Sequence, residues 1–176
     1  MKLKKFEYNQ VKSTNSTAIR KIKSGFKNGI ILSHKQTNGR GRYGRKWISL
    51  KGNLFISIFI RVNDQINIRK TTNFNCKIVK QSIEKNFKNK ITIKLPNDIL
   101  VNQKKICGIL QEIFNFKNET FMIVGIGVNI VASPNIKNHE TTYLNKYLKN
   151  KISKQILFEN IKTVYEKNLN FFNLCI

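Results

Sequence analysis

The 176-residue chain is poor in the residue types that build disulfide frameworks and zinc sites. It has three widely spaced cysteines, Cys76, Cys107 and Cys175, and only two histidines. An odd number of distant cysteines with so few histidines indicates neither a set of disulfides nor a metal cluster. We therefore interpret the cysteines as small buried hydrophobic residues in a reducing compartment.

Long apolar runs are also missing. No segment approaches the roughly 20 consecutive apolar residues that cross a bilayer, and residues 1–7 contain no apolar core of a signal peptide. We expect no membrane contact and a cytoplasmic location. The sequence has no internal repeat, linker or low-complexity segment, and its length suits a single domain over residues 1–176.

Acidic residues are scarce, since nine Asp and Glu stand against 33 Lys and Arg, for a formal net charge of +24. Such an excess is typical of proteins that bind nucleic acid. Here, however, the lysines are spread along the whole chain and accompany many Asn and Ile residues, as an AT-rich coding sequence would produce. We attribute most of the charge to composition, expect no specific DNA binding, and expect long-range attraction of acidic partners.

Hydrophobic periodicity predicts a mixed α and β domain. Strands are expected at residues 2–8, 30–34, 53–62, 91–95, 97–101, 105–114 and 121–131, and helices at 13–29, 71–87, 144–148 and from 153 onward. The hairpin-like connections, including a turn at Asn102 and Gln103, favour an α+β fold. We predict a mixed, largely antiparallel sheet flanked by helices rather than a doubly wound parallel sheet.

One stretch, QTNGRGRYGRKW over residues 36–47, combines three glycines with four cations. Glycine lets the backbone approach a ligand closely, and arginine presents forked donors that match carboxylate and phosphate oxygens. Considered alone, the stretch fits a ligand-binding loop, a nucleic-acid contact or a solvated surface equally well. Its neighbours in the fold have to decide between these interpretations.

Two polar segments accompany this loop. Ser13, Thr14 and Asn15 precede an apolar helical pattern, where they suit either a helix cap or a site for a neutral polar head group. Asn97 and Asp98 follow Pro96, and Asp98 is one of only two aspartates in the chain. These residues suit a turn, or a carboxylate that orients a lysine or a magnesium-bound phosphate.

Two further segments lie in predicted strands. Lys105 enters an apolar strand with Gly108 three residues later, so its side chain is a candidate partner for a reacting carboxylate or phosphate above the sheet. A Gly-x-Gly at Gly125 and Gly127 precedes Asn129. It is a weak nucleotide signal, because it lies within a strand and lacks a strand-turn-helix setting.

In this order, the segments from Ser13 to Asn129 resemble the biotin protein ligase family, also called biotin carboxyl-carrier-protein synthetases, over the catalytic domain only. The resemblance implies a fold like the class II aminoacyl-tRNA synthetase cores. It implies a ligase that activates biotin with ATP, supplied with Mg²⁺, to biotinyl-5′-adenylate. The biotin then passes to a lysine of the biotin carboxyl carrier protein of acetyl-CoA carboxylase or a similar carboxylase.

The resemblance also implies roles for individual residues. The biotin head group would be held by Ser13, Thr14, Asn15 and Gln36. The loop from Gly39 would close over biotin and adenylate through Arg40, Gly41 and Arg42. Lys105, followed by Gly108, would meet the biotin carboxylate and the α-phosphate, which makes Lys105 and Arg42 the catalytic candidates. Trp47 and Asn129 would bind the adenylate, with Asn97 and Asp98 nearby, and no metal is assigned beyond the Mg²⁺ that accompanies ATP.

The sequence departs from the family pattern at Leu95, where Trp is usual. We expect neither the N-terminal helix-turn-helix of repressor-type members nor the small C-terminal β-barrel. The alternatives are a lipoate or octanoate ligase or transferase of the same fold, an inactive relative, and, more distantly, a basic nucleic-acid-binding protein. The choice between monomer and homodimer stays open, as does the identity of the carrier.

Overall fold

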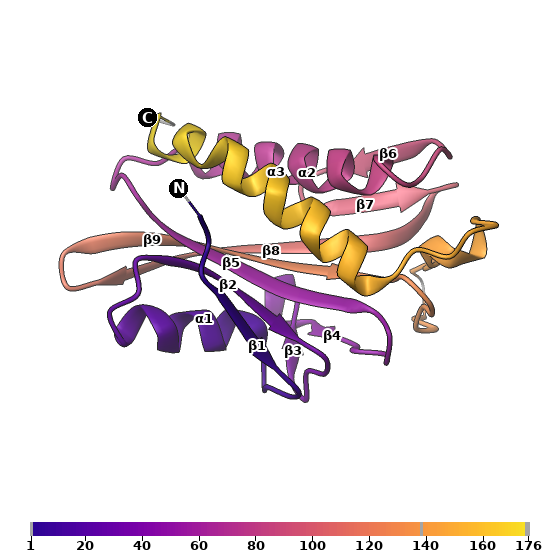
Figure 1. The fold of residues 1–176 in the computed structure, drawn as a ribbon, viewed down its shortest axis with the longest axis horizontal. Helices are drawn as coiled ribbons and strands as arrows, with labels where there is room; N and C mark the ends of the chain where they lie inside the picture. The colour runs from indigo at the N-terminus through magenta and orange to yellow at the C-terminus, as the bar shows by residue number, and fades with distance from the viewer. Residues whose placement is uncertain (1, 138, 175–176) are drawn as a thin grey trace.

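The computed structural model describes residues 2–137 and 139–174. A seven-stranded sheet in the order β1-β2-β5-β9-β8-β7-β6 forms its centre (Figure 1). β1 runs parallel to β2, and every other neighbouring pair in this sheet is antiparallel. The α+β fold with a largely antiparallel sheet is therefore confirmed.

The strands of the large sheet are β1 (Lys5–Tyr8), β2 (Asn28–Ser33), β5 (Leu54–Val62), β6 (Ile91–Lys94), β7 (Asp98–Val101), β8 (Lys104–Phe116) and β9 (Glu119–Val128). The other elements are α1 (Thr14–Lys23), α2 (Ile68–Glu84), α3 (Lys154–Leu174), the 3₁₀ turns η1 (Arg42–Gly44) and η2 (Leu144–Lys146), and a two-stranded sheet of β3 (Gly39–Arg40) and β4 (Lys46–Trp47). Within the described residues, no helix is both long and apolar enough to cross a membrane.

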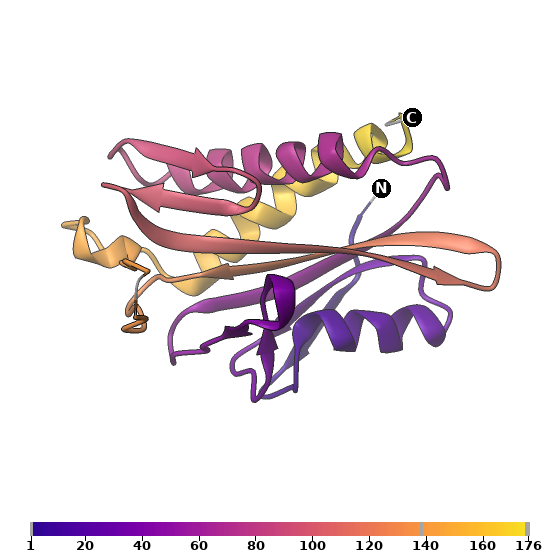
Figure 2. The same ribbon diagram turned by 180° about the vertical axis from the view of Figure 1, so that it is seen from behind.

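Helices cover the two faces of the sheet unequally. α2 and α3 lie together over one face, where the larger hydrophobic cluster includes Tyr165 and Phe172 (Figure 1). α1 covers part of the other face through a smaller cluster with Ala18, Ile22 and Phe59, and the β3–β4 sheet lies beside it (Figure 2). β5 is buried on both sides along most of its length, which explains its nearly continuous run of apolar residues. The half-covered face is where the candidate site lies.

Several predicted boundaries were wrong: β1 begins at Lys5 rather than at residue 2, and β9 ends at Val128 rather than at residue 131. α1 ends at Lys23 instead of at Asn28 and Gly29, because Gly25 takes a left-handed φ of 93° and Asn28 already begins β2. α2 begins at Ile68, three residues early, because the Asn67 side chain accepts the N–H of Lys70 and caps it. The expected helix at 144–148 is the short 3₁₀ turn η2.

Two of the cysteines are buried, as predicted. Burial raises the pKa of the Cys76 thiol to about 11, with the negative charge of Asp98 adding to the effect. Burial also raises the pKa of the Cys107 thiol well above its usual range. Both thiols therefore stay protonated and behave as small apolar groups. Cys175 lies outside the described residues.

Asn53, fully buried just before β5, fastens the chain that leaves β9. Its Oδ1 accepts the N–H groups of Ile130 and Val131 at 2.9 and 3.0 Å, and its Nδ2 donates to the carbonyl of Ala132 at 2.8 Å. These bonds satisfy backbone groups that no strand partner reaches. One side chain thus fixes where the loop after β9 begins.

We predict that Asn53→Ala lowers the free energy of unfolding by about 2–4 kcal/mol, because it leaves buried backbone donors without an acceptor. Equilibrium denaturation with urea measures the change. Asn63→Ala is the matched control, since Asn63 accepts one N–H, from Gln65, in an exposed turn. The control is expected to cost less than about 1 kcal/mol. Equal losses in the two variants would contradict the fastening role.

Candidate functional site

On the face of the sheet that α1 partly covers, three glycines leave part of the backbone of β8 and β9 without side chains. Gly108 and Gly127 face one another across the two strands, and Gly125 lies two residues earlier on the same side. A Cβ on Gly108 would lie 2.7 Å from Cζ3 of Trp47, and one on Gly127 would lie 2.6 Å from Cζ2 of the same ring. We call this bare backbone, formed by Gly108, Gly125 and Gly127, the glycine shelf.

The indole of Trp47 lies on the glycine shelf. Trp47 is at the end of β4, where it pairs with Gly39 of β3. It is the one tryptophan of the chain. In the part of the chain that the structure describes, its buried indole N–H has no acceptor. An unpaired buried donor of this kind is costly, and an acceptor on a ligand at the shelf would satisfy it.

A β-bulge directs the side chain of Lys105 toward the glycine shelf. Lys105 faces Leu100 of β7 while Cys107 faces Ile99, so Ile106 is an extra residue and the register shifts there. Both Ile106 and Cys107 are buried in the core, which leaves Lys105 on the side of Gly108. The atom Nζ of Lys105 would lie 3.1 Å from a Cβ at Gly108. The bulge therefore lets a lysine in an apolar strand reach the shelf.

Asp98 orients this lysine. Its Oδ1 lies 2.7 Å from Nζ of Lys105, and both side chains are about one quarter exposed, at 26% and 28%. The ammonium also lies 5.5 Å from the centre of the Trp47 ring, within the range of a cation–π contact. Of the alternatives that the sequence left open for Asp98, the geometry supports a carboxylate that holds a lysine. The cationic head therefore stands at the edge of the shelf, beside the aromatic ring.

The loop of residues 39–47 lies over the sheet, and two of its arginines bind residues beyond the loop. Arg40 forms an ion pair with Glu112 of β8, with Nη2 and Oε2 2.7 Å apart. Arg42 donates to Oδ1 of Asn97 at 3.2 Å and to the hydroxyl of Tyr43 at 2.9 Å. The Arg40 ion pair joins the loop to β8, which carries Gly108 and Lys105, and the Arg42 bond joins it to the turn before β7, where Asn97 also donates to the carbonyl of Ile109 in β8.

The start of α1 forms the opposite side of the site. Thr14 donates to Oε1 of Gln36 from its N–H at 2.8 Å and from its hydroxyl at 3.1 Å. Ser13 occupies the cap position, but its side chain makes no capping hydrogen bond. Ser13, Thr14 and Asn15 are all buried. The helix-cap interpretation therefore explains the position of Ser13 but not its buried hydroxyl.

Both the nitrogen and the oxygen of the Asn15 amide form hydrogen bonds with protein groups. Its Nδ2 donates to the carbonyl of Leu110 at 3.2 Å and to Oε2 of Glu112 at 2.7 Å, while its Oδ1 accepts the hydroxyl of Ser57. A Cβ at Gly125 would overlap the Asn15 amide. The amide is thus fully engaged with protein groups.

Most of the predicted site residues lie around the glycine shelf, whereas Gly41 and Asn129 have other contacts. The contacts above place these residues around the shelf: Thr14, Asn15, Gln36, Gly39, Arg40, Arg42, Trp47, Asn97, Asp98, Lys105 and Gly108. Gly41 closes the loop turn by donating its N–H to the carbonyl of Arg45 at 2.7 Å. Asn129 is buried beyond the shelf, donates to the carbonyl of Thr142 at 3.2 Å and accepts from Asn53 at 3.4 Å.

Sequence reasoning missed Glu112, Ser57 and Asn53. Glu112 is one of nine acidic residues, and it shares a strand face with Gly108 at a spacing of four. A period of two along β8 therefore carried a signal that places its carboxylate near the loop. Ser57 and Asn53 gave no comparable signal, because their roles depend on pairings with distant segments. Leu95, the departure from the family pattern, is 62% exposed beside the cis peptide bond to Pro96.

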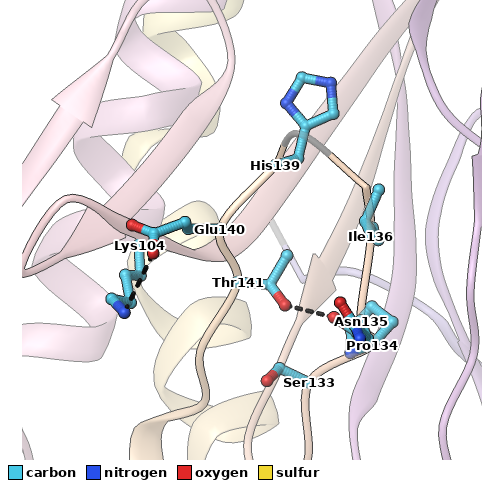
Figure 3. Close-up of a pocket in the computed structure, with 8 residues that line it drawn as sticks. All are labelled: Lys104, Ser133, Pro134, Asn135, Ile136, His139, Glu140 and Thr141. Atoms are coloured by element: carbon cyan, nitrogen blue, oxygen red, sulfur yellow. Dashed lines mark hydrogen bonds and ion pairs between the residues drawn. The ribbon is translucent and has the colours of Figure 1, made fainter.

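A separate hollow of about 400 Å³ opens beside the first residues of β8 (Figure 3). It is lined by Lys104, which pairs with Glu140 at 3.3 Å, and by residues 133–136 and 139–141. The Lys105 backbone bonds to Glu140, which lines the hollow, and to nearby Thr142: its N–H donates to the Glu140 carbonyl and its carbonyl accepts the Thr142 N–H, each at 2.9 Å. The hollow is therefore structurally continuous with the strand that carries the lysine. In the described residues, no group of three or more His, Cys, Asp or Glu is arranged to hold a metal ion.

Comparison with known proteins agrees with this architecture. Residues 8–129 match the biotin/lipoate A/B protein ligase family. The chain is 35% identical over 147 residues to the bifunctional ligase/repressor BirA of Bacillus subtilis, covering 78% of this chain and 45% of that protein. It is 28% identical over 149 residues to the biotin–[acetyl-CoA-carboxylase] ligase of Mycobacterium tuberculosis, covering 77% and 52%.

The fold is that of biotin protein ligase from Aquifex aeolicus in complex with biotin and ATP, with a TM-score of 0.79 at 24% identity over 97% of this chain and 72% of that one. The chain therefore has a class II aminoacyl-tRNA synthetase-like α+β fold. The chain belongs to the biotin/lipoate A/B protein ligase family. It spans about half the length of the curated relatives it matches.

We predict that Gly127→Ala displaces Trp47 from the shelf, because the added Cβ would overlap the indole ring. Overpacking of this kind is expected to cost about 1–3 kcal/mol of stability. The emission of the folded protein should shift to longer wavelength, since its one tryptophan becomes exposed. The fluorescence spectrum, recorded under conditions in which the variant is folded, measures this shift.

Gly25→Ala is the control for this variant. Gly25 has a backbone conformation that disfavours alanine, with a φ of 93°, but no atom lies within 4 Å of the added Cβ and the position is at the far end of α1. The control should lose stability while its emission stays that of the parent protein. An unchanged spectrum in folded Gly127→Ala would show that Trp47 does not rest on the shelf.

Proposed function

We propose that this chain forms the catalytic domain of a ligase that activates biotin with ATP and transfers it to a carrier-protein lysine. The observation that carries the proposal is the Lys105 ammonium, held by Asp98 at the edge of the glycine shelf and near a loop rich in arginine. An apolar acid bound beside the Trp47 ring brings its carboxylate to this cation. The named activity of the Mycobacterium tuberculosis relative supports biotin as that acid.

In the first step, a carboxylate oxygen of biotin attacks the α-phosphorus of ATP. The bond between the α- and β-phosphates breaks, and pyrophosphate leaves with that bond's electron pair. Two anionic groups must approach one another, so a cation fixed between them lowers the barrier by proximity and charge stabilisation. Lys105 has this role in the proposal, and its ion pair with Asp98 keeps the ammonium oriented before the substrates bind.

In the second step, the amine of a carrier lysine attacks the carbonyl carbon of the mixed anhydride and AMP leaves. The intermediate is hydrolysable, so water has to be kept away from it between the steps. The loop of residues 39–47, with Arg42 bound to Asn97, provides this cover. The carrier is taken to be the biotin carboxyl carrier protein of acetyl-CoA carboxylase or a similar carboxylase, as the relative's name suggests. The net charge of +24 favours approach of an acidic carrier.

Several other residues complete the proposed site. Thr14 and Gln36 bind the polar head of biotin at the start of α1, and Ser13 adds a buried hydroxyl. We propose that the nucleotide extends from Lys105 toward Asn129 and the hollow that Lys104, Ser133 and Glu140 line. The carboxylates of Asp98 and Glu112 are already paired with cations, so neither is free to bind Mg²⁺. Mg²⁺ would therefore arrive on the ATP phosphates and neutralise their charge.

The proposal predicts biotin-dependent exchange of pyrophosphate into ATP. Lys105→Ala should reduce the exchange rate at least about 100-fold, as expected for loss of a charge that stabilises the transition state. Lys90→Ala, at an exposed loop lysine before β6, should leave the rate unchanged. Exchange is measured with biotin, with lipoate and with neither acid.

The outcomes separate the candidates. Exchange with lipoate but not biotin would replace the proposed substrate by that of the lipoate branch of the family. Exchange with neither acid, together with nucleic-acid binding that weakens steeply with salt and survives Lys105→Ala, would favour a binding protein. Each result therefore selects one function.

A second prediction concerns the loop. Arg42→Ala removes the hydrogen bond to Asn97, so the loop should cover the shelf less completely and the adenylate should escape or hydrolyse several-fold faster. The measurement is the decay of preformed biotinyl-5′-adenylate on the enzyme without carrier. An adenylate lifetime equal to that of the parent would exclude this covering role.

A further inference from the structure

A chain of polar side chains joins the start of α3 to the edge of the large sheet. Nζ of Lys154 lies 2.5 Å from Nδ1 of His34, which follows β2. Nε2 of the same ring lies 3.1 Å from Oε1 of Glu7 on β1, and the other carboxylate oxygen pairs with Lys5 at 2.8 Å. Two strands, β5 and β9, separate β2 from β8 in the sheet, so this cluster is distinct from the site at Lys105.

The contacts of His34 define which nitrogen carries a proton. Lys5, above all through its hydrogen bond, lowers the pKa of the Glu7 carboxyl, so this group is ionised and can only accept. Nε2 of His34 therefore carries the N–H and donates it to Glu7. Nδ1 is left as the acceptor, and one hydrogen lies between it and Nζ of Lys154.

Three features of its position disfavour the charged form of Lys154. The side chain is half-buried, and this burial lowers the pKa of the ammonium, although the charge of Glu7 acts in the opposite direction. Lys154 is also the first residue of α3, where the positive end of the helix dipole opposes a cation and the first turn holds no acidic residue. Its acceptor is a neutral ring rather than a carboxylate. More of this amine is therefore a neutral nucleophile than at a solvated lysine.

A small reagent can reach this amine. The side chains of His34 and Glu7 are 41% and 42% exposed, and that of Lys154 is partly exposed. The net charge of +24 attracts anionic reagents over long range. The cluster thus combines an activated amine, a neighbouring base and a group that orients the base, which is the arrangement of nucleophilic sites in general.

We propose that Lys154 is a site of acylation by small acyl phosphates, with His34 as its base and Glu7 as the residue that positions the base. The neutral amine attacks the carbonyl carbon, and phosphate leaves with the electron pair of the bond between that carbon and the phosphate oxygen. The proton that the amine loses passes to Nδ1 of His34, and Glu7 stabilises the resulting imidazolium. The product is an amide at Nζ, and the start of α3 loses one positive charge.

The first test compares two lysines of the same helix. The intact chain is treated with acetyl phosphate, and the rate of acetylation of each lysine is measured by mass spectrometry of its peptides. Lys162 is the internal control, because its side chain is 23% exposed and pairs with Glu166 at 3.2 Å, which holds its proton. Lys154 should react about three- to tenfold faster, as expected for an amine with a neighbouring base. Equal rates, or slower acetylation of Lys154, would overturn the proposal.

The second test removes the base. His34→Gln keeps a polar side chain but cannot take the proton, so acetylation of Lys154 should slow about three- to tenfold while that of Lys162 stays within about twofold of the parent. His139→Gln, at the other histidine of the chain, is the matched control and should leave both rates unchanged. A parent-like rate at Lys154 in His34→Gln would exclude the ring as its base.

The third test concerns Glu7. Glu7→Gln should slow acetylation of Lys154 about twofold or more in the parent, but should slow it no further in His34→Gln, because the carboxylate acts through the ring. Additive losses would show that Glu7 does not act by positioning His34. None of these measurements uses biotin or ATP, so the acylation site stands or falls independently of the proposed ligase function.

Discussion

The paired glycines of β8 and β9 decide what the rest of the site can do. A sheet face normally presents a side chain at every second position, and any Cβ at Gly108 or Gly127 would occupy the space of the Trp47 ring. Their absence leaves flat backbone on which an aromatic ring or an elongated acid can lie. This face also lacks the double cover of α2 and α3, so the space remains reachable from solvent. The shelf is thus produced by missing atoms rather than by a particular reactive group.

Charge is organised around that surface more tightly than the composition suggests. The chain carries 33 basic residues against nine acidic ones, yet two of the nine acids lie at the site. Asp98 holds Lys105 and Glu112 holds Arg40, so each carboxylate fixes a cation in place without adding a free negative charge. An anionic substrate therefore meets cations that are already oriented. This pairing distinguishes the loop from a solvated basic surface, which was an open interpretation of its sequence.

Local patterns predicted most of the fold and part of the site. Periodicity identified the seven strands of the large sheet and the three α-helices, and the motif order brought Lys105, Asp98 and the arginine loop into one hypothesis, which the family match supports. Local patterns did not predict features that depend on contacts between distant parts of the chain. The end of α1 was set by a left-handed Gly25, which competes with Asn28 as a stop signal. The bulge at Ile106, which turns Lys105 to the shelf, follows from pairing with β7 and has no local signature.

Trp47 links the shelf to the loop, because the ring that covers the glycines belongs to the segment that must move when a ligand enters. Its buried N–H lacks an acceptor among the described residues, so the covered state keeps an unsatisfied group. A ligand that displaces the ring, or that accepts from it, relieves this cost. The ion pair of Arg40 with Glu112 acts in the opposite direction and holds the loop down. A loop balanced between these two effects can open for a substrate and still cover a hydrolysable intermediate.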